Sequence, residues 1–381
     1  MNVFQLKPRV CFGENSLDAL KELKAQNAVI FTDGFMYKSG TADRIAATMT
    51  GCGQIKIFSE IKPDPPVELI ADALRFLLDS NAELAVALGG GSVIDAAKAT
   101  LWMYQKKTGN KLPLIALPTT SGTGSEVTQF SVITDRDLGM KYPLYSEDML
   151  PDIAILSAEL TVSVPANITA DTGFDVITHA LEAYISTKAN DFTDALAEKA
   201  LKLAFEYLPT ACKNGKDTVA REKMHTASCL AGMAFNDVSL GVNHAIAHAL
   251  GATFHIPHGR ANALILPHVM RYNASLETTG YGSEVTPTCK KLAEIARMIG
   301  LPAQNARMGA SNLVAHITRM SRELGIPQSL GDAGVTRADY LSNKAHILKN
   351  AAKDVTALTN PRPIDEAAVE QIVKGIEKFK A

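Results

Sequence analysis

The pattern of strand-like and helical segments changes once along this chain, near residue 160. Before that point, short runs rich in apolar and β-branched residues alternate with segments that carry apolar residues at helical spacing. The runs are residues 27–33, 54–60, 82–91, 113–120 and 152–157. Strands that alternate with helices are typical of a mostly parallel sheet covered by helices on both faces. The first part of the sequence therefore predicts an α/β fold.

After about residue 160 the strand-like runs stop, and one helical pattern follows another. Segments such as FDVITHALEAYIS, VNHAIAHALG and SNLVAHITRMSRELG carry apolar residues at helical spacing, with Gly and Pro between them. We therefore expect two domains. The first is a mostly parallel α/β domain over residues 1–162, and the second is an all-helical domain over residues 163–381.

Composition excludes several classes of function. The 381 residues carry a formal net charge of −2, which favours neither nucleic acid nor an anionic membrane as a partner. No run of 18 apolar residues occurs, so we expect no membrane span, and the amino terminus lacks the pattern of a secretory signal. The five cysteines are widely spaced and odd in number, which is typical of free thiols in a reducing cytoplasm.

Two glycine-containing loops in the first half each follow a predicted strand. In the first loop Gly89, Gly90 and Gly91 precede a helix that begins near Ser92, so free N–H groups at the start of that helix can bind an anion such as pyrophosphate. The second loop, residues 118–128, adds the hydroxyls of Thr119, Thr120, Ser121 and Thr123. Neither loop matches GxGxxG or GxxxxGK[ST], and each alone is equally compatible with a plain turn. Their occurrence after strands of one sheet favours a dinucleotide.

Asp33 ends the first of the predicted parallel strands. A carboxylate there can accept hydrogen bonds from a ribose diol and would repel a 2′-phosphate, which favours NAD over NADP. An Asp-Gly pair after a strand is also an ordinary turn, and this alternative stays open. Asp33 precedes the glycine loop in the chain, which argues against the usual Rossmann order.

Histidines are concentrated in residues 243–259, which hold four of the nine in the chain. His244 and His248 lie four residues apart, as do Asp175 and His179, so each pair shares one face of a predicted helix. His258 follows in a loop. Imidazoles with one carboxylate suit Fe²⁺, Zn²⁺ or a similar ion. Spacing alone does not decide between His244 and His248 as a ligand, and the absence of HExxH argues against a zinc peptidase.

These motifs together resemble the iron-containing (group III) alcohol dehydrogenases over nearly the whole chain. The finer likeness is to members that reduce short aldehydes, including the 1-propanol dehydrogenases of microcompartments. The matching segments are FGENSLDAL (12–20), GGGSVIDAAKA (89–99), PTTSGTGSEVT (118–128), KYP (141–143), DVITHALEAY (175–184), DFTDALAEKA (191–200) and HAIAHALGATFHIPHGRANALILPH (244–268).

The resemblance implies a dehydroquinate synthase-like fold, with an N-terminal nucleotide-binding domain and a helical metal-binding domain. It implies that Fe²⁺, or alternatively Zn²⁺, is bound by Asp175, His179, His244 and His258, and that His248 is a proton relay beside the nicotinamide. It implies that NAD(H) is bound by Asp33, Gly89, Gly90, Gly91, Ser92, Thr119, Thr120, Thr123, Thr128 and Lys141.

The expected activity is the reversible reduction of a short-chain aldehyde, for example propanal, to its primary alcohol by hydride transfer. Three alternatives remain open: a zinc-dependent polyol dehydrogenase acting on compounds such as glycerol, a lyase on the same scaffold, and a non-catalytic helical module stabilised by metal. The expected partners are the small-molecule alcohol or aldehyde and further copies of this chain, in a dimer or a higher homo-oligomer. Packaging with a microcompartment shell or partner enzymes is a further option that the resemblance implies.

Overall fold

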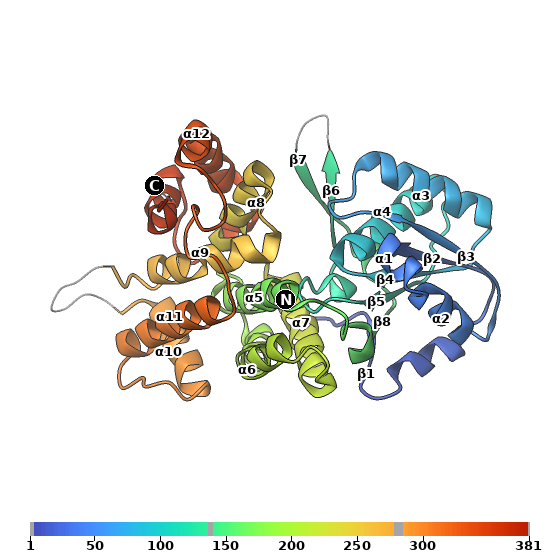
Figure 1. Cartoon of the computed structure of the whole chain (residues 1–381), viewed down its shortest axis with the longest axis horizontal. Helices are drawn as coiled ribbons and strands as arrows, with labels where there is room; N and C mark the ends of the chain where they lie inside the picture. Colours follow the sequence, from blue (N-terminus) through green and yellow to red (C-terminus); the bar gives the residue numbers. More distant parts are fainter. Residues whose placement is uncertain (1–3, 136–139, 278–284, 380–381) are drawn as a thin grey trace. The chain divides into compact units, whose positions relative to one another are not determined.

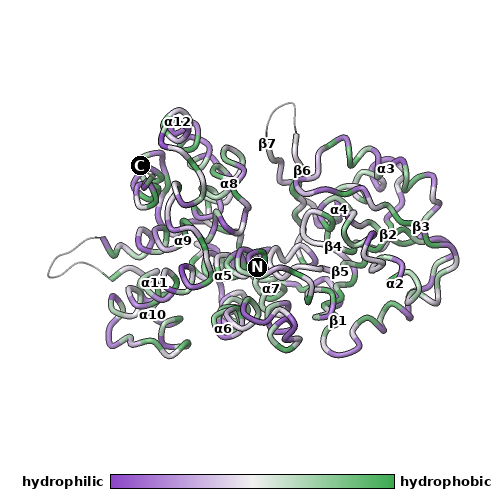
Figure 2. Tube along the Cα trace, viewed as in Figure 1, coloured by the Kyte–Doolittle hydropathy of each residue, from purple (hydrophilic) through white to green (hydrophobic). Residues whose placement is uncertain are grey.

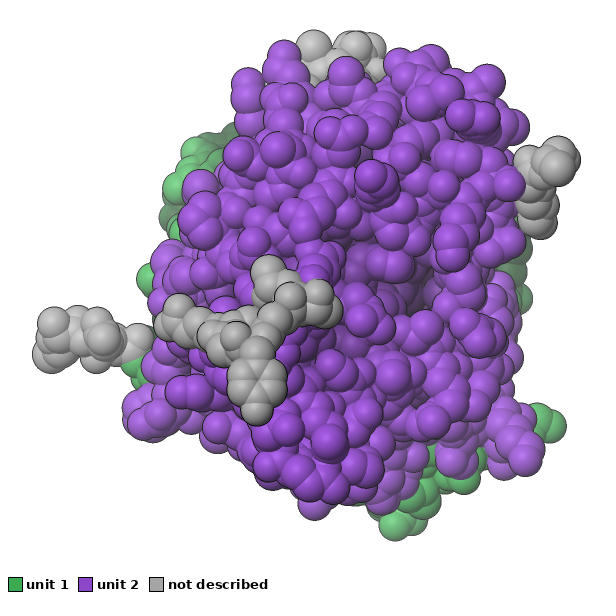
Figure 3. Space-filling model, turned by 90° about the vertical axis from the view of Figure 1, so that its left-hand side faces the viewer, with its two compact units in different colours: residues 1–164, 216–236 green, residues 165–215, 237–381 purple. Residues whose placement is uncertain are grey.

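The computed structural model describes residues 4–135, 140–277 and 285–379, and it divides into two compact units, coloured separately in Figure 3. Unit 1 contains residues 1–164 and 216–236, and unit 2 contains residues 165–215 and 237–381. The first break in the chain, after Val164, lies close to the expected boundary at residue 162. Residues 216–236 differ from expectation, because they belong to unit 1 although the sequence pattern placed them in the helical domain.

A six-stranded parallel sheet forms the centre of unit 1 (Figure 1). In spatial order its strands are β1 (Arg9–Phe12), β8 (Ile153–Leu156), β5 (Leu114–Pro118), β4 (Leu84–Gly89), β2 (Ala25–Asp33) and β3 (Cys52–Ile61). The five predicted strands are confirmed as β2, β3, β4, β5 and β8. The edge strand β1 was missed, because its four residues are too few to show a pattern.

Alternate residues of the central strands pack on opposite faces of the sheet. Val29 and Phe31 of β2 join the core formed with α3 (Val67–Ser80) and α4 (Gly91–Thr108). Ala28 and Ile30 join the core formed with the other set of helices, η1 (Ser16–Glu22), α1 (Gly34–Lys38) and α2 (Thr41–Thr48). Burial on both faces explains why these strands appear in the sequence as continuous apolar runs. By comparison, helix α12 of unit 2 carries mostly hydrophilic residues (Figure 2).

A two-stranded antiparallel hairpin of unit 1 follows the second glycine loop. Its strands are β6 (Phe130–Asp135) and β7 (Met140–Tyr145), which pair from Phe130 with Tyr145 to Asp135 with Met140. The short helices η2 (Ser125–Val127), η3 (Glu147–Met149) and η4 (Ala158–Leu160) connect the remaining segments. The sequence did not predict this hairpin.

The helix α7 (Thr218–Val238) belongs almost entirely to unit 1 because it packs against the second glycine loop. A Cβ atom on Gly232 would lie 2.9 Å from the Cα of Gly124, so the two backbones touch only because both residues lack side chains. Ser121 Oγ lies 2.8 Å from Nδ1 of the buried His225 on the same helix. Helical periodicity gives no information about which neighbour a helix packs on, and the expected domain division therefore missed this contact.

Every secondary-structure element among the described residues of unit 2 is a helix, in agreement with the expected fold class. Its helices are α5 (Ala166–Ile185), α6 (Asp191–Lys213), α8 (Val242–Phe254), α9 (His258–Asn273), α10 (Pro287–Met298), α11 (Ala306–Glu323), α12 (Arg337–Lys353), η5 (Val355–Thr359), α13 (Glu366–Val373) and η6 (Lys374–Ile376). From Thr169 to Ile185 nearly every residue of α5 is buried, which makes it the central helix of this unit. Within the described ranges, no helix is both long and apolar enough to cross a lipid bilayer.

Candidate metal centre and nucleotide loops

Three helices of unit 2 bring together the four side chains that were predicted to bind metal. Asp175 and His179 lie one turn apart on α5, His244 lies on α8, and His258 is the first residue of α9. Each side chain presents one ligand atom, and these four atoms all lie within 4.8 Å of one another. Ligands on opposite sides of one transition-metal ion are about 4 Å apart, because each bond is about 2.1 Å long. The four atoms therefore lie close to the spacing that one ion requires.

The four side chains differ strongly in burial. The exposed fractions are 3% for Asp175, 5% for His179 and 1% for His244, but 37% for His258. The rings of His179 and His244 stack at 4.6 Å between centroids. Burial, together with the neighbouring imidazoles, holds the pKa of His244 well below its usual range. A neutral imidazole has a lone pair available for a cation.

The amide nitrogen of Asn262 contacts three of the four proposed ligands. The fully buried Asn262 directs Nδ2 at Asp175 Oδ1 (2.7 Å) and at Nε2 of both His244 and His258 (3.1 Å each). An amide nitrogen carries two hydrogens, so in the tautomers that leave a lone pair on both Nε2 atoms it cannot satisfy all three acceptors at once. A divalent cation would take these lone pairs, and the donor set of one carboxylate and three imidazoles fits such an ion.

Glu182, which the sequence analysis did not single out, lies directly behind His244. Its Oε2 is 2.5 Å from His244 Nδ1, and its Oε1 accepts a 2.7 Å hydrogen bond from the backbone N–H of Asn243. Glu182 is buried and lies on α5, one turn before its carboxyl end. A carboxylate on the far nitrogen of an imidazole fixes the tautomer and the ring orientation of a metal ligand.

His248 is held apart from this set by a different carboxylate. Its Nδ1 lies 2.8 Å from Oδ2 of Asp354, and its ring stacks on His258 at 5.3 Å. The group of four closely spaced ligand atoms contains His244 and not His248. His255 ends α8 in the left-handed backbone conformation with φ 55° and is exposed.

In unit 1, the predicted nucleotide-binding residues gather at the carboxyl ends of adjacent strands. Asp33 ends β2, Gly89 ends β4, and the second loop follows Pro118, which ends β5. The chain passes outward from β2 to β3 and then returns to β4 on the other side of β2. Such a reversal of strand order is where open α/β sheets bind ligands.

The two glycine loops contact each other. A Cβ atom on Gly91 would lie 2.6 Å from Cγ2 of Thr123, and one on Gly90 would lie 3.3 Å from Oγ1 of Thr120. A larger residue at position 91 would therefore displace the second loop. Ser92 follows in the first turn of α4, where backbone N–H groups are free to bind an anion.

Asp33 also has a structural role. Its Oδ1 accepts hydrogen bonds from the N–H groups of Phe35 (2.8 Å) and Met36 (2.9 Å), which makes it the N-cap of α1. The structural alternative to cofactor binding therefore takes the form of a helix cap and not of an ordinary turn. Capping uses one carboxylate oxygen, and the other can still accept hydrogen bonds from a ribose.

Lys98 is a further residue that sequence reasoning missed. Its buried ammonium donates hydrogen bonds to Ser125 Oγ (2.9 Å), Thr128 Oγ1 (3.2 Å) and Phe130 O (2.9 Å). Burial lowers its pKa to about 8, against the opposing charges of Asp95 and Glu126. This lysine ties α4 to the second glycine loop.

The remaining predicted cofactor residues differ in burial and in the contacts they make. Thr119 and Thr128 are buried, and the hydroxyl of Thr128 already accepts a hydrogen bond from Lys98. The backbone of Lys141 pairs with Thr134 in the hairpin, but its side chain lies outside the described part of the structure.

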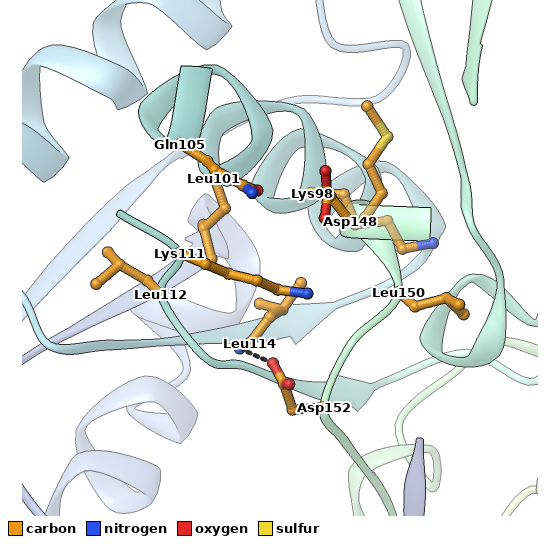
Figure 4. Close-up of a pocket in the computed structure, with 10 residues that line it drawn as sticks. Lys98, Leu101, Gln105, Lys111, Leu112, Leu114, Asp148, Leu150 and Asp152 are labelled. Carbon is orange, nitrogen blue, oxygen red and sulfur yellow. Dashed lines mark hydrogen bonds between the residues drawn. The ribbon is translucent and has the colours of Figure 1, made fainter. Parts of the chain in front are cut away.

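A separate small pocket lies at the amino end of β5 (Figure 4). Asp152 accepts a 2.9 Å hydrogen bond from the N–H of Leu114 there, and Lys111, Asp148 and Gln105 also line it. The glycine loops follow the carboxyl ends of β4 and β5, so the pocket and the loops lie at opposite ends of β5. The pocket therefore does not include the glycine loops, although Lys98, which holds the second loop, also lines it.

Comparison with known proteins covers both halves of the chain. Residues 7–158 match the family model of iron-containing alcohol dehydrogenase, and residues 169–376 match the model of the C-terminal part of that family. The chain is 43% identical to 1-propanol dehydrogenase PduQ of Salmonella typhimurium over 99% of this chain and 100% of that protein.

Solved structures show the same fold. A 1,3-propanediol oxidoreductase superimposes with a TM-score of 0.88 at 34% identity, over 98% of this chain and 99% of the other. Sulfoacetaldehyde reductase from Bifidobacterium kashiwanohense, solved in complex with NAD⁺, superimposes with a TM-score of 0.86 at 29% identity, over 100% of both chains. The expectation of an enzyme of the alcohol dehydrogenase class is thereby confirmed, and this chain belongs to the iron-containing alcohol dehydrogenase family.

Proposed function

We propose that this protein is an NAD(H)-dependent dehydrogenase that interconverts a short-chain primary alcohol and its aldehyde, for example 1-propanol and propanal. In this proposal Fe²⁺ is bound by Asp175, His179, His244 and His258. The observation that carries the proposal is the convergence of one carboxylate and three imidazoles from three helices. The substrate class is supported by the likeness to 1-propanol dehydrogenase PduQ, and the cofactor by the likeness to a reductase solved with NAD⁺.

The residues of unit 2 suit the expected chemistry. When bound, a divalent cation polarises the carbonyl oxygen of the substrate, and NADH supplies the hydride. Asp175 contributes one negative charge and the neutral imidazoles contribute none, so the site keeps a net positive charge with a divalent ion. The ligands are nitrogen and oxygen without thiolate, which suits Fe²⁺ and also Zn²⁺. A zinc-dependent polyol dehydrogenase is therefore the second candidate.

His248 is the proposed proton relay, and Asp354 orients it. Burial alone would raise the pKa of Asp354. The hydrogen bond and the charge of His248 outweigh this effect and lower the pKa of Asp354 below its usual value, so the carboxylate stays ionised. An ionised carboxylate can only accept a hydrogen bond, so Nδ1 of His248 must carry the hydrogen. Nε2 is then the nitrogen that exchanges a proton with substrate or water.

The proposed cofactor site lies on the strand ends of unit 1. Gly89, Gly90, Gly91 and Ser92 offer backbone N–H groups to the pyrophosphate, and Thr119, Thr120 and Thr123 add hydroxyls from the second loop. Asp33 accepts hydrogen bonds from the ribose through the carboxylate oxygen that does not cap α1. Thr128 and Lys141 complete the proposed set.

An anaerobic assay of NADH oxidation tests the proposal. Metal-stripped protein is reloaded with Fe²⁺ or Zn²⁺ and supplied with a series of aldehydes from acetaldehyde to hexanal, with glycerol oxidation by NAD⁺ as the comparison. We expect the Fe²⁺-loaded protein to turn over the short aldehydes with one NADH consumed per alcohol formed. Activity on glycerol with Zn²⁺ alone would favour the polyol alternative, and no NADH oxidation with any aldehyde and either metal would refute the proposal.

Replacing Glu182 with glutamine is expected to weaken Co²⁺ or Fe²⁺ binding by about 10–100-fold, the usual effect of removing a partner behind a metal ligand. The neutral amide of glutamine keeps the size of the side chain and an oxygen that can accept a hydrogen bond from Nδ1 of His244, but it lacks the negative charge that raises the basicity of this imidazole. Metal titration of the stripped protein measures the dissociation constant. Glu198→Gln is the matched control on α6, since Glu198 contacts Tyr184 and lies outside the ligand cluster. An unchanged dissociation constant for Glu182→Gln would contradict the role given to this residue.

Assembly into a dimer or higher homo-oligomer, and packaging with a microcompartment shell or partner enzymes, stay predictions from the resemblance.

A further inference from the structure

His258 is positioned differently from the other three proposed ligands. The other three are almost fully buried, whereas more than a third of the His258 side chain is exposed. It is the first residue of α9, and the chain reaches it directly from the left-handed residue His255 through Ile256 and Pro257. Its location therefore depends on how the first turn of α9 is held against α5, which carries Asp175.

A two-pronged ion pair joins these helices beside the ligand cluster. Arg260 donates from Nε to Asp171 Oδ1 (3.1 Å) and from Nη2 to Asp171 Oδ2 (2.9 Å). Asp171 lies on α5 one turn before Asp175, and Arg260 lies two residues after His258. The side chain of Asp171 is 9% exposed and that of Arg260 is 30% exposed. Two parallel N–H···O bonds between planar groups fix orientation as well as distance, which a single bond from lysine does not.

Gly259, between the ligand and the arginine, lets the two helices touch. A Cβ atom at this position would lie 2.2 Å from the carbonyl oxygen of Asp171 and 3.4 Å from Cβ of Asp175. The backbone of α9 therefore rests directly on the turn of α5 that leads to Asp175. This contact sets the separation of the helices, and the Arg260–Asp171 pair limits the rotation of the first turn of α9.

The pair also balances charge. Asp171 and Asp175 are carboxylates on one face of the same helix, and both are buried. Arg260 supplies the positive charge that compensates Asp171, which leaves Asp175 as the carboxylate available to a cation.

We propose that Arg260 and Asp171 are positioning residues of the metal site, which hold His258 at the distance from Asp175 that one divalent ion requires. This inference rests on the proposed metal-binding function. Arg260 and Asp171 are not ligands themselves, but in this proposal they determine the position of His258, the most exposed ligand.

Co²⁺ is a suitable probe, because its visible absorption spectrum reports the number and geometry of its ligands. We expect Arg260→Met to weaken Co²⁺ binding to the stripped protein by about 10–100-fold and to change the visible spectrum of the loaded protein. Arg260→Lys keeps the charge but not the two parallel bonds, so it should restore only part of the affinity and leave the spectrum altered. Asp171→Asn combined with Arg260→Met should bind Co²⁺ no more weakly than Arg260→Met alone, because both changes remove one interaction.

Lys291→Met is the matched control. Lys291 pairs with Asp194 in the same unit at 2.7 Å, with side-chain exposures of 30% and 23%. This variant should lose stability to heat while its Co²⁺ spectrum and dissociation constant stay as in the wild type. Thermal unfolding of each stripped variant separates a folding defect from a binding defect, and Arg260→Lys provides the measurement if Arg260→Met does not fold.

Two outcomes separate the hypotheses. A wild-type spectrum and dissociation constant in Arg260→Lys and in folded Arg260→Met would overturn the positioning role and leave the metal site intact. Wild-type Co²⁺ binding in His258→Ala would instead overturn the proposed metal site itself.

Discussion

His258→Ala is expected to bind Fe²⁺ or Co²⁺ at least about 100-fold more weakly than the wild type. Loss of a residue that only hydrogen-bonds to a metal ligand already lowers metal affinity by about 10–100-fold, and this variant loses a ligand itself. The variant keeps Asp175, His179 and His244, but three ligands leave the exposed side of the ion open to water. Reduction of propanal by NADH should fall to the level of the metal-stripped protein. Metal analysis after gel filtration, together with the anaerobic assay, measures both effects.

His346→Ala is the control for this experiment. His346 is an exposed histidine of α12 that contacts Asn350, so its replacement removes an imidazole without touching the cluster. We expect wild-type metal content and turnover in this variant. Wild-type metal content in His258→Ala would remove His258 from the ligand set, and a loss of metal in His346→Ala would point to a general effect of histidine removal.

The fold was predictable where the pattern of apolar residues along the sequence reflects the packing of a strand or helix. The doubly buried strands β2, β4 and β5 read as apolar runs because both of their faces pack on helices, and their order along the chain implied a parallel sheet. The packing of α7 on unit 1 was not predictable. It depends on Gly124 and Gly232, which lie more than a hundred residues apart and carry no pattern that links them.

The grouping of the candidate metal ligands was also predictable only as far as local sequence spacing reaches. The four-residue spacing placed Asp175 and His179 on one face of a helix, and His244 and His248 on another. It did not predict which of His244 and His248 joins the cluster, because the carboxylate partners of these two side chains are distant in sequence. Glu182 lies 62 residues from His244, and Asp354 lies 106 residues from His248. Side-chain partners of this kind are fixed by tertiary packing, so a local pattern cannot reveal them.

Resemblance extended the prediction further than spacing did, but only for residues within the matching motifs. It singled out His244 and His258, whose side chains converge with Asp175 and His179. It gave no role to Lys98, whose ammonium holds the second glycine loop, or to Arg260, although both residues lie inside matching segments. Both are cations that sequence reasoning assigns to the solvent by default.

Gly259→Ala tests whether the direct contact of α9 with α5 determines the metal site. The added methyl group would lie 2.2 Å from a backbone carbonyl oxygen of α5, so the helices must move apart. Overpacking of this kind costs about 1–3 kcal/mol of unfolding free energy, and a shift of about 1 Å at a reacting site costs about 100-fold in turnover. We therefore expect a lower midpoint of thermal unfolding, a larger loss of Co²⁺ affinity than in Arg260→Lys, and turnover reduced by about 100-fold.

Gly34→Ala is the matched control, because Gly34 also begins a helix, and the nearest atom to an added Cβ is 4.0 Å away. Where space allows, Gly→Ala stabilises a protein by about 0.4–1 kcal/mol through the unfolded chain, so this variant should unfold at the same temperature or higher and bind Co²⁺ normally. The comparison isolates the contact between α9 and α5, since both variants add the same methyl group to the first turn of a helix. Equal stability and equal Co²⁺ affinity in the two variants would mean that α9 can shift without cost. The position of His258 would then have to be set by its own side-chain contacts, and the direct contact of α9 with α5 would have no part in forming the metal site.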